Sequence, residues 1–300
     1  MKTAMIPADW PHRSHSDIVG AGGLSWHVQR FGAGPQLLAI HGTAASTHSF
    51  RDVAAQLADR FEIVMADLPG HGFSSAMDAP GLPRVAEALG GLLRALSVEP
   101  AVVAGHSAGA AIALRMTLDR IIEPAAVVGL APALKPYGGA ADGLASGLVK
   151  LAFLNPVAPR LFARRADPDR VAKLIARTGS RLDAEGAGYY ARLLQRPDHV
   201  AGALRLMAHW KLRPLQDDLP RLQPEATLVL GENDHATPPG DADTASRTIP
   251  ARRVETLAGL GHLAHEEDPA AAAAAVIRAA ERNGVLTAPA PERRSARKAG

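Results

Sequence analysis

The chain has 300 residues, of which 47% are hydrophobic and 21% charged, and it contains no cysteine. This length and apolar content can bury a substantial core, whereas the lack of cysteine excludes disulfides and a thiol nucleophile. The 33 Lys and Arg outnumber the 30 Asp and Glu by three, without a nucleic-acid-binding motif, so nucleic acid is not an expected partner. No stretch has the apolar length of a signal peptide or a transmembrane segment, and a cytoplasmic protein is expected.

Apolar runs alternate with helical patterns along most of the chain. The helical pattern at 85–96 places Val85, Leu89, Leu92, Leu93 and Leu96 on one face. Near-continuous apolar strands that alternate with helices indicate an α/β fold with a mostly parallel sheet covered on both sides. Strands are predicted at 24–30, 35–40, 61–66, 100–104, 125–130, 226–230 and 253–256.

The most specific motif follows the strand at 100–104. Residues 105–109 have the sequence Gly-His-Ser-Ala-Gly, and a helical run begins at Ala110. This context predicts a nucleophile elbow, a tight turn that strains the backbone of Ser107 and holds its hydroxyl above the sheet. An elbow also requires two backbone amides that bind a developing oxyanion. We expect these from Ala108 and from Thr43, with Ala44 as the alternative, in the loop after the strand at 35–40.

The alternation stops between residues 135 and 219, where several helices are predicted. Their breaks fall at Asn155-Pro156, Asp167-Pro168 and Arg196-Pro197. Helices inserted here would form a lid over the carboxyl ends of the strands, and the lid's apolar residues favour a sizeable apolar ligand. Eleven basic and five acidic residues between 150 and 205 give the lid a charge of +6. A field of this sign can attract anionic ligands, or the arginines form only solvated helix faces. The candidate substrate contacts are Arg164 and Arg165, for their charge, and Trp210, for its apolar ring.

An acid and a base are predicted after two later strands, in the order that the elbow requires. Asp234 follows the strand at 226–230 and is the favoured acid, with Glu232 as its competitor. His262 lies in a loop just after the strand at 253–256 and is the favoured base. His265 is the alternative, although it lies where the last helix should begin.

These features divide the chain into four parts. Residues 1–15 are an N-terminal extension, 16–134 and 220–285 form the core, and 135–219 form the lid. Residues 286–300 are a basic tail that we expect to be disordered. The tail is either a solvated end or a contact for anionic lipid or an acidic partner. Its basic residues are Arg293, Arg294, Arg297 and Lys298, against Glu292.

Most of residues 24–280 resembles the α/β-hydrolase superfamily. The resemblance rests on the elbow, the His41-Gly42 loop, the Asp67-Leu68-Pro69-Gly70-His71-Gly72 loop and the later Asp and His. A narrower resemblance is to the magnesium-chelatase accessory proteins of bacteriochlorophyll synthesis. In that pattern Gly is usual where Ala44 stands, and Trp where Phe50 stands. The narrower resemblance rests on Asp9-Trp10-Pro11, the loop at 41–48, residues 105–111, Leu154-Asn155-Pro156, Thr178-Gly179-Ser180 and residues 199–204.

The narrower resemblance implies a role alongside insertion of magnesium into protoporphyrin IX. The chain has no G-x-x-x-x-G-K-[ST] phosphate loop, which excludes the ATP-hydrolysing chelatase subunit, and no cofactor or metal is expected. Two hypotheses follow. Either Ser107, His262 and Asp234 hydrolyse an ester or related acyl group, or the same pocket holds a porphyrin or docks on chelatase subunits without catalysis. In the second hypothesis, Arg164 and Arg165 would pair with the propionate groups of the porphyrin, which is an apolar anion.

Overall fold

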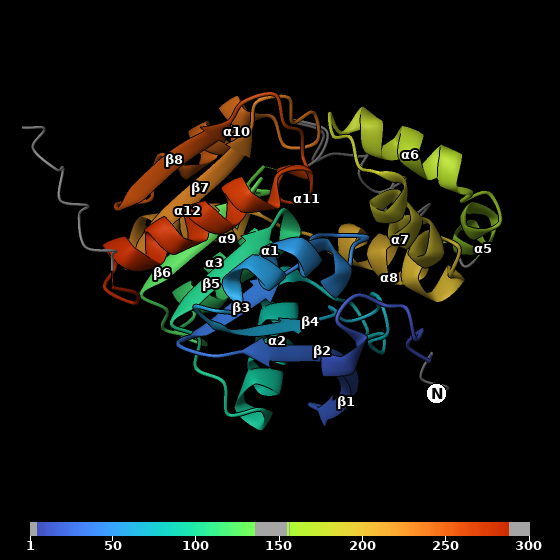
Figure 1. The fold of residues 1–300 in the computed structure, drawn as a ribbon, viewed down its shortest axis with the longest axis horizontal. Coiled ribbons are helices and arrows are strands. Elements are labelled where there is room, and N and C mark those ends of the chain that lie inside the picture. Colours follow the sequence, from blue (N-terminus) through green and yellow to red (C-terminus); the bar gives the residue numbers. More distant parts are fainter. Residues whose placement is uncertain (1–4, 136–154, 156, 288–300) are drawn as a thin grey trace, which may run out of the picture.

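The computed structural model describes residues 5–135, 155 and 157–287. Within these residues, eight strands form one twisted sheet in the order β1-β2-β4-β3-β5-β6-β7-β8 (Figure 1). Strands β4 to β8, together with β3, run parallel, whereas β2 is antiparallel to both of its neighbours. The predicted α/β fold with a mostly parallel sheet is therefore confirmed. The strands are β1 (Ser16–Ala21), β2 (Leu24–Gly32), β3 (Gln36–Ile40), β4 (Glu62–Ala66), β5 (Val102–His106), β6 (Ala126–Leu130), β7 (Glu225–Gly231) and β8 (Arg252–Leu257).

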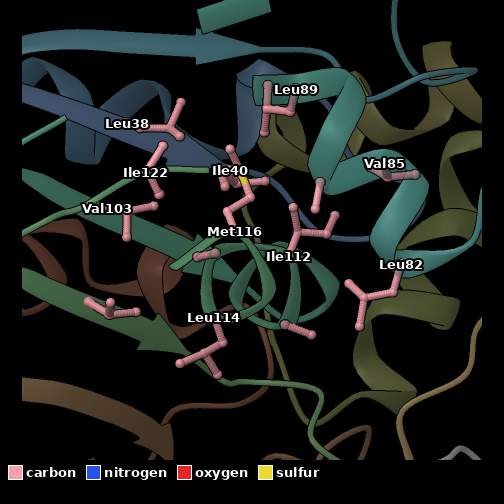
Figure 2. Close-up of a cluster of buried hydrophobic side chains, with 14 of the residues drawn as sticks. Leu38, Ile40, Leu82, Val85, Leu89, Val103, Ile112, Leu114, Met116 and Ile122 are labelled. Atoms are coloured by element: carbon pink, nitrogen blue, oxygen red, sulfur yellow. The ribbon is translucent and has the colours of Figure 1, made fainter. Parts of the chain in front are cut away.

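Successive side chains of a strand point to opposite faces of the sheet. Helices cover both faces of the central strands, so both sets of side chains are buried. In β3, Leu38 and Ile40 belong to a cluster with helices α2 (Leu82–Ala95) and α3 (Ala108–Leu118), part of which is drawn in Figure 2. Leu37 and Ala39 of the same strand belong to a second cluster, with α1 (Arg51–Leu57) and α12 (Pro269–Arg282). Burial of each large apolar side chain contributes about 2 kcal/mol, so both faces hold the strand ends firmly in place.

Two local features differ from the sequence expectation. Strand β1 was not predicted, because its sequence Ser-Asp-Ile-Val-Gly-Ala lacks an apolar run, yet it pairs with β2. Helix α2 begins at Leu82, three residues before the predicted Val85. Pro83 fits in the first turn because the N–H groups of that turn have no partner within the helix, so the N–H that proline lacks is not needed there. The predicted apolar face of α2 is buried in the first core cluster.

The described part of the segment between β6 and β7 contains helices joined by loops and no strand, and we call residues 157–210 the cap. Figure 1 shows its helices beyond the carboxyl ends of the strands. The predicted breaks at Asp167-Pro168 and Arg196-Pro197 are helix starts, where each proline begins a helix. The cap helices are α5 (Ala158–Ala163), α6 (Pro168–Arg177), α7 (Ala184–Leu194) and α8 (Pro197–Ala208).

The last part of the predicted lid packs on the core. Helix α9 (Arg213–Asp218) contacts α3, and Leu212, Leu215 and Leu219 belong to the core cluster on the α2 and α3 side of the sheet. Lid residues 136–154 and 156, with Leu154 and Pro156 of the narrower resemblance, lie outside the described residues. The same holds for the basic side chains of the tail, Arg293, Arg294, Arg297 and Lys298.

The N-terminal segment ties the cap to the core. Trp10 is buried, with Phe73 from the core on one side and Tyr189 of α7 on another. Asp9 accepts two hydrogen bonds from the Arg192 guanidinium, at 2.8 and 2.9 Å. Residues 9 and 10 therefore bridge two parts of the molecule that are far apart in the sequence.

Candidate active site

The turn between β5 and α3 has the strained geometry of an elbow. Ser107 has φ 52° and ψ −114°, which a residue with a side chain rarely adopts. The flanking glycines are required by space. An added Cβ on Gly105 would lie 2.4 Å from the Gly109 carbonyl oxygen, and one on Gly109 would lie 2.1 Å from that of Ile40. The Ser107 amide donates to the Leu130 carbonyl at 2.9 Å, which fixes the turn against the end of β6.

Asp234 and His262 meet after β7 and β8. The Asp234 Oδ2 atom lies 2.8 Å from His262 Nδ1 and accepts the Thr237 hydroxyl at 2.6 Å. The other oxygen, Oδ1, accepts the backbone amides of Ala236 and Thr237, both at 2.8 Å. Hydrogen-bond donors therefore reach both oxygens of this carboxyl group. An ionised carboxylate only accepts, so the proton on the imidazole is assigned to Nδ1, and Nε2 is left with a free lone pair.

The nucleophile turn is in direct contact with the histidine loop. His106, the residue before Ser107, has its Nε2 3.0 Å from the backbone carbonyl oxygen of His262, and the two rings are 4.8 Å apart. No hydrogen bond recorded among residues 5–135, 155 and 157–287 joins the Ser107 hydroxyl to the His262 ring. Such bonds are often long in the absence of a ligand and shorten in the reacting complex. The structure thus brings Ser107, His262 and Asp234 to one edge of the sheet.

The two alternative residues have other environments. Glu232 is exposed and accepts the Gly259 amide at 2.8 Å, which supports the loop before His262. His265 is 1% exposed and packs between Phe50 and His106, and neither of its ring nitrogens has a partner among the described residues. Burial above all, with the nearby Arg51 guanidinium, lowers the pKa of His265 to about 3. An imidazole without a carboxylate partner is poorly suited to act as the base.

The loop after β3 lies against the nucleophile. An added Cβ on Gly42 would be 3.1 Å from the Ser107 Cβ. The amides of Thr43, of its alternative Ala44 and of Ala108 donate no hydrogen bond to an acceptor within the described part of the chain. An oxyanion hole needs two such amides, and either Thr43 or Ala44 could supply one beside Ala108. Ala44 has φ 63°, a left-handed conformation that explains why glycine is usual at this position in the resembling family.

A histidine of the cap holds this loop in place. The Gly72 amide donates to Nδ1 of His199 at 2.9 Å, so the proton of this ring lies on Nε2, which donates to the Ala44 carbonyl at 3.1 Å. Behind the loop, buried Asp67 accepts the Thr47 amide at 2.8 Å and binds His27 Nδ1 at 2.7 Å. Burial alone would raise the pKa of Asp67, but His27 beside it holds that pKa well below its usual range.

The buried histidines make the fold sensitive to acid. Burial lowers the pKa of His199 to about 4 and lowers the pKa values of His41, His48, His71 and His106 as well. In the unfolded chain such rings bind a proton below about pH 6.5, whereas in the fold they stay neutral until lower pH. The unfolded state therefore binds more protons between about pH 6.5 and 4, so stability is greatest above this window and is lost as the pH falls through it.

We expect the free energy of unfolding to fall by up to about 1.4 kcal/mol per pH unit for each such ring below pH 6.5. Glu266 has the opposite effect. Burial raises its pKa to about 7, so below this pH its carboxyl binds a proton more readily in the folded state than in the unfolded state, which offsets the loss from one histidine. Urea denaturation at pH 7.5, 6 and 5 measures the change. A midpoint that does not move between pH 7.5 and 5 would contradict neutral, buried histidines.

A loop of the cap clamps both the acid loop and the base loop. The Thr178 carbonyl accepts the amides of His235 at 3.1 Å and His262 at 3.4 Å. The buried Ser180 hydroxyl accepts the Leu263 amide at 2.7 Å. Between them, Gly179 has φ +87°, and an added Cβ there would lie 1.8 Å from the Asn233 carbonyl oxygen. The cap is therefore joined to the two loops by backbone contacts.

Substitution Gly179→Ala is expected to destabilise the fold by about 3 kcal/mol or more, because the methyl group meets backbone and the φ is unfavourable. Thermal or urea unfolding measures this effect. The matched control is Gly188→Ala in α7, where an added Cβ has nothing within 4 Å and a helical Ala should stabilise by about 0.5 to 1 kcal/mol. Equal stabilities of the two variants would contradict the clamp.

The predicted substrate contacts are less closely tied to this site. Trp210 packs against the core cluster on the α2 and α3 side, and its buried indole N–H has no partner among the described residues. Arg164 and Arg165 are exposed just after α5.

No group of three or more His, Asp or Glu within residues 5–135, 155 and 157–287 could hold a metal ion. No helix in this part of the chain is long and apolar enough to cross a membrane.

Sequence reasoning missed several residues of the site. Thr237, three positions after Asp234, supplies a hydroxyl to the carboxylate, and His106 supplies the contact to the histidine loop. A Thr shortly after a loop Asp is a recognisable turn signal, but the contact of His106 joins segments 156 positions apart and has no local signature. His199 and Ser180 appeared only as part of a family resemblance.

The strained turn at Ser107, the Asp234–His262 pair after later strands, and the sheet order together define a class of fold. A family model of the alpha/beta hydrolase fold matches residues 35–269, and the chain belongs to this family. The magnesium-chelatase 30 kDa subunit of Rhodobacter capsulatus is 41% identical over 274 residues, which cover 89% of this chain and 94% of that protein. The narrower resemblance seen in the sequence is thereby confirmed.

Solved structures add support for the fold alone. An esterase from Thermogutta terrifontis has a TM-score of 0.72 at 21% identity, and it covers 89% of this chain and 97% of its own. The epoxide hydrolase CorEH has a TM-score of 0.73 at 19% identity, with coverages of 89% and 98%. Proteins of different chemistry share this fold, so the likeness does not choose a reaction.

Proposed function

We propose that the protein is a serine hydrolase that cleaves an ester or related acyl group. The observation that carries the proposal is the His262–Asp234 pair, because four donors to the one carboxylate orient the imidazole and leave its Nε2 free. The loop of His262 also contacts His106, the residue before the strained Ser107. A free imidazole lone pair next to a serine held in an elbow is the arrangement of a base and its nucleophile.

The proposed reaction has two steps. The Ser107 hydroxyl oxygen forms a bond to the acyl carbon, and its proton passes to Nε2 of His262. The ester bond then breaks, the alcohol leaves with that proton, and an acyl group remains on Ser107. Water then gives a proton to Nε2 of His262 and attacks the acyl carbon, the bond from that carbon to the Ser107 oxygen breaks, and His262 returns the proton to the Ser107 oxygen, which releases the acid and restores both residues. Amides of Thr43 and Ala108 would stabilise the negative oxygen in both steps, and loss of one such donor costs about 3 kcal/mol of barrier stabilisation.

A fluorophosphonate probe tests this proposal. It reacts with an activated serine, so it should label the wild-type protein at Ser107 and leave Ser107→Ala unlabelled, as peptide mapping of the adduct would show. A second variant, Ser49→Ala, replaces another buried serine in the core and should label like wild type. Folded wild-type protein that takes up no probe, or takes it up at another residue, would refute the proposal.

We further propose that this chemistry serves bacteriochlorophyll synthesis alongside magnesium chelatase. The support is the 41% identity to a protein named as a chelatase subunit. Of the predicted lid at 135–219, the cap would cover the site, and Trp210, Arg164 and Arg165 are proposed contacts for an apolar anion such as a porphyrin. These contacts predict porphyrin binding that weakens when both arginines become alanine. Unchanged affinity in that variant would remove the two arginines from the site.

The same identity favours a second candidate, a protein that docks on the chelatase or holds a porphyrin without catalysis. The two candidates are separated by complementation in cells that lack the natural protein. Pigment synthesis restored by Ser107→Ala would show that the biological role needs no acyl chemistry. Failure of a stably folded Ser107→Ala variant, beside rescue by wild type, would show that it does.

A further inference from the structure

The two outermost helices of the cap expose large apolar side chains. Helix α5 packs on α8 and α6 packs on α7, and Figure 1 shows both helices at the rim of the described part of the molecule. Of the seven large hydrophobic residues exposed in the described part of the chain, four fall within residues 157–174. They are Val157, Leu161, Phe162 and Leu174, with exposed fractions between 39% and 52%.

Basic side chains surround these apolar ones. Residues 157–177 contain six basic and two acidic residues, a net charge of +4. Arg170 pairs with Asp167, but the other five are exposed and form no ion pair within the described residues. Arg170 also donates to the Arg165 carbonyl at 3.3 Å, which joins the start of α6 to the end of α5. The five are Arg160, Arg164, Arg165, Lys173 and Arg177.

Charge is also distributed unevenly between the cap and the rest of the chain. Residues 157–210 carry +5 and residues 288–300 carry +3, whereas the net charge of the chain is +3, so all other residues sum to −5. An anionic surface would therefore attract the cap and repel the acidic body. A molecule with this polarity is oriented by the field before any contact forms.

We propose that this surface, the α5–α6 face, binds the surface of an anionic lipid bilayer. Apolar side chains set among arginines and lysines are the pattern of a segment that lies in a membrane interface, with apolar groups inserted and long basic side chains reaching the headgroups. An acidic protein partner would complement the charge but would not need four scattered apolar side chains. The inference is independent of the proposed reaction, but Arg164 and Arg165 would serve either this face or the proposed porphyrin contacts, so the test uses Arg160 and Lys173.

Flotation of the full-length protein with vesicles tests the proposal. Binding is expected to vesicles that contain phosphatidylglycerol, to weaken with salt, and to be absent with phosphatidylcholine alone. Arg160→Gln combined with Lys173→Gln should weaken binding about 30-fold, because each basic residue near such a surface contributes about 1 kcal/mol. Leu161→Gln combined with Leu174→Gln should also weaken it.

The matched control is Arg94→Gln combined with Arg120→Gln, which removes the same charge near the amino ends of the strands and should bind like wild type. Phe162→Trp adds a second readout, since its emission should shift to shorter wavelength when the α5–α6 face meets anionic vesicles. The proposal is overturned if wild type does not float with anionic vesicles. It is also overturned if the cap variants bind as well as wild type, which would assign binding to the basic tail.

Discussion

Substitution His262→Ala is expected to lower kcat for an activated ester by about 10⁶-fold, comparable to the loss of a serine nucleophile. The reason lies in the geometry around Nε2. Asp234 holds the opposite nitrogen at 2.8 Å, so this imidazole alone is both oriented and free to take the Ser107 proton. Initial rates with a p-nitrophenyl ester, at a temperature where the variant is folded, measure the effect.

His265 provides the control for this prediction. It lies three positions later and was the alternative base, but it is buried without a polar partner among the described residues. His265→Leu keeps a similar volume and removes no hydrogen bond, so kcat should change less than tenfold. If His265→Leu loses as much activity as His262→Ala, the assignment of the base is wrong.

Asp234→Asn is expected to lower kcat by about 10⁴-fold without unfolding the protein. Oδ1 of the native carboxylate accepts the Ala236 and Thr237 amides, so the carbonyl oxygen of the substituted side chain would occupy this position. The NH₂ group of that side chain would then face Nδ1 of His262 and donate to it. This forces the imidazole proton onto Nε2, and a protonated Nε2 cannot accept the proton of Ser107.

Kinetics and nitrogen NMR of the His262 ring together measure this effect. The variant should show the proton on Nε2, where wild type shows it on Nδ1, a difference that a structural defect would not produce. Glu232→Gln is the control, because this exposed carboxylate contacts only the Gly259 amide within the described residues. An Asp234→Asn variant with nearly full activity would contradict the proposed acid.

The elbow and the order of acid and base could be predicted because each depends on local sequence. A Ser between two glycines, after an apolar strand and before a helix, has few other conformations available. Asp234 and His262 followed from their positions directly after strands, since the carboxyl ends of parallel strands meet at one edge. The same argument did not exclude Glu232 or His265, because the direction of a side chain in a loop leaves no trace in the sequence.

The contacts that hold the site together could not be predicted. Gly179 and Ser180 reach the loops of Asp234 and His262 from a part of the chain that precedes both, and His199 reaches Ala44 across 155 positions. Such contacts depend on how the cap packs, and small residues that approach backbone look like ordinary loop residues in a sequence. Strand β1 was missed for a related reason, since its pairing with β2 decides its conformation more than its composition does.

The central claim is that Ser107 carries the acyl group during turnover. Rapid quenching of wild-type protein with an activated ester, followed by intact-protein and peptide mass spectrometry, measures this directly. The account predicts a mass increase equal to one acyl group, found on the peptide that contains Ser107, which forms within the first turnover and disappears as substrate is consumed. Ester hydrolysis without any covalent adduct, or with the adduct on another residue, would contradict it.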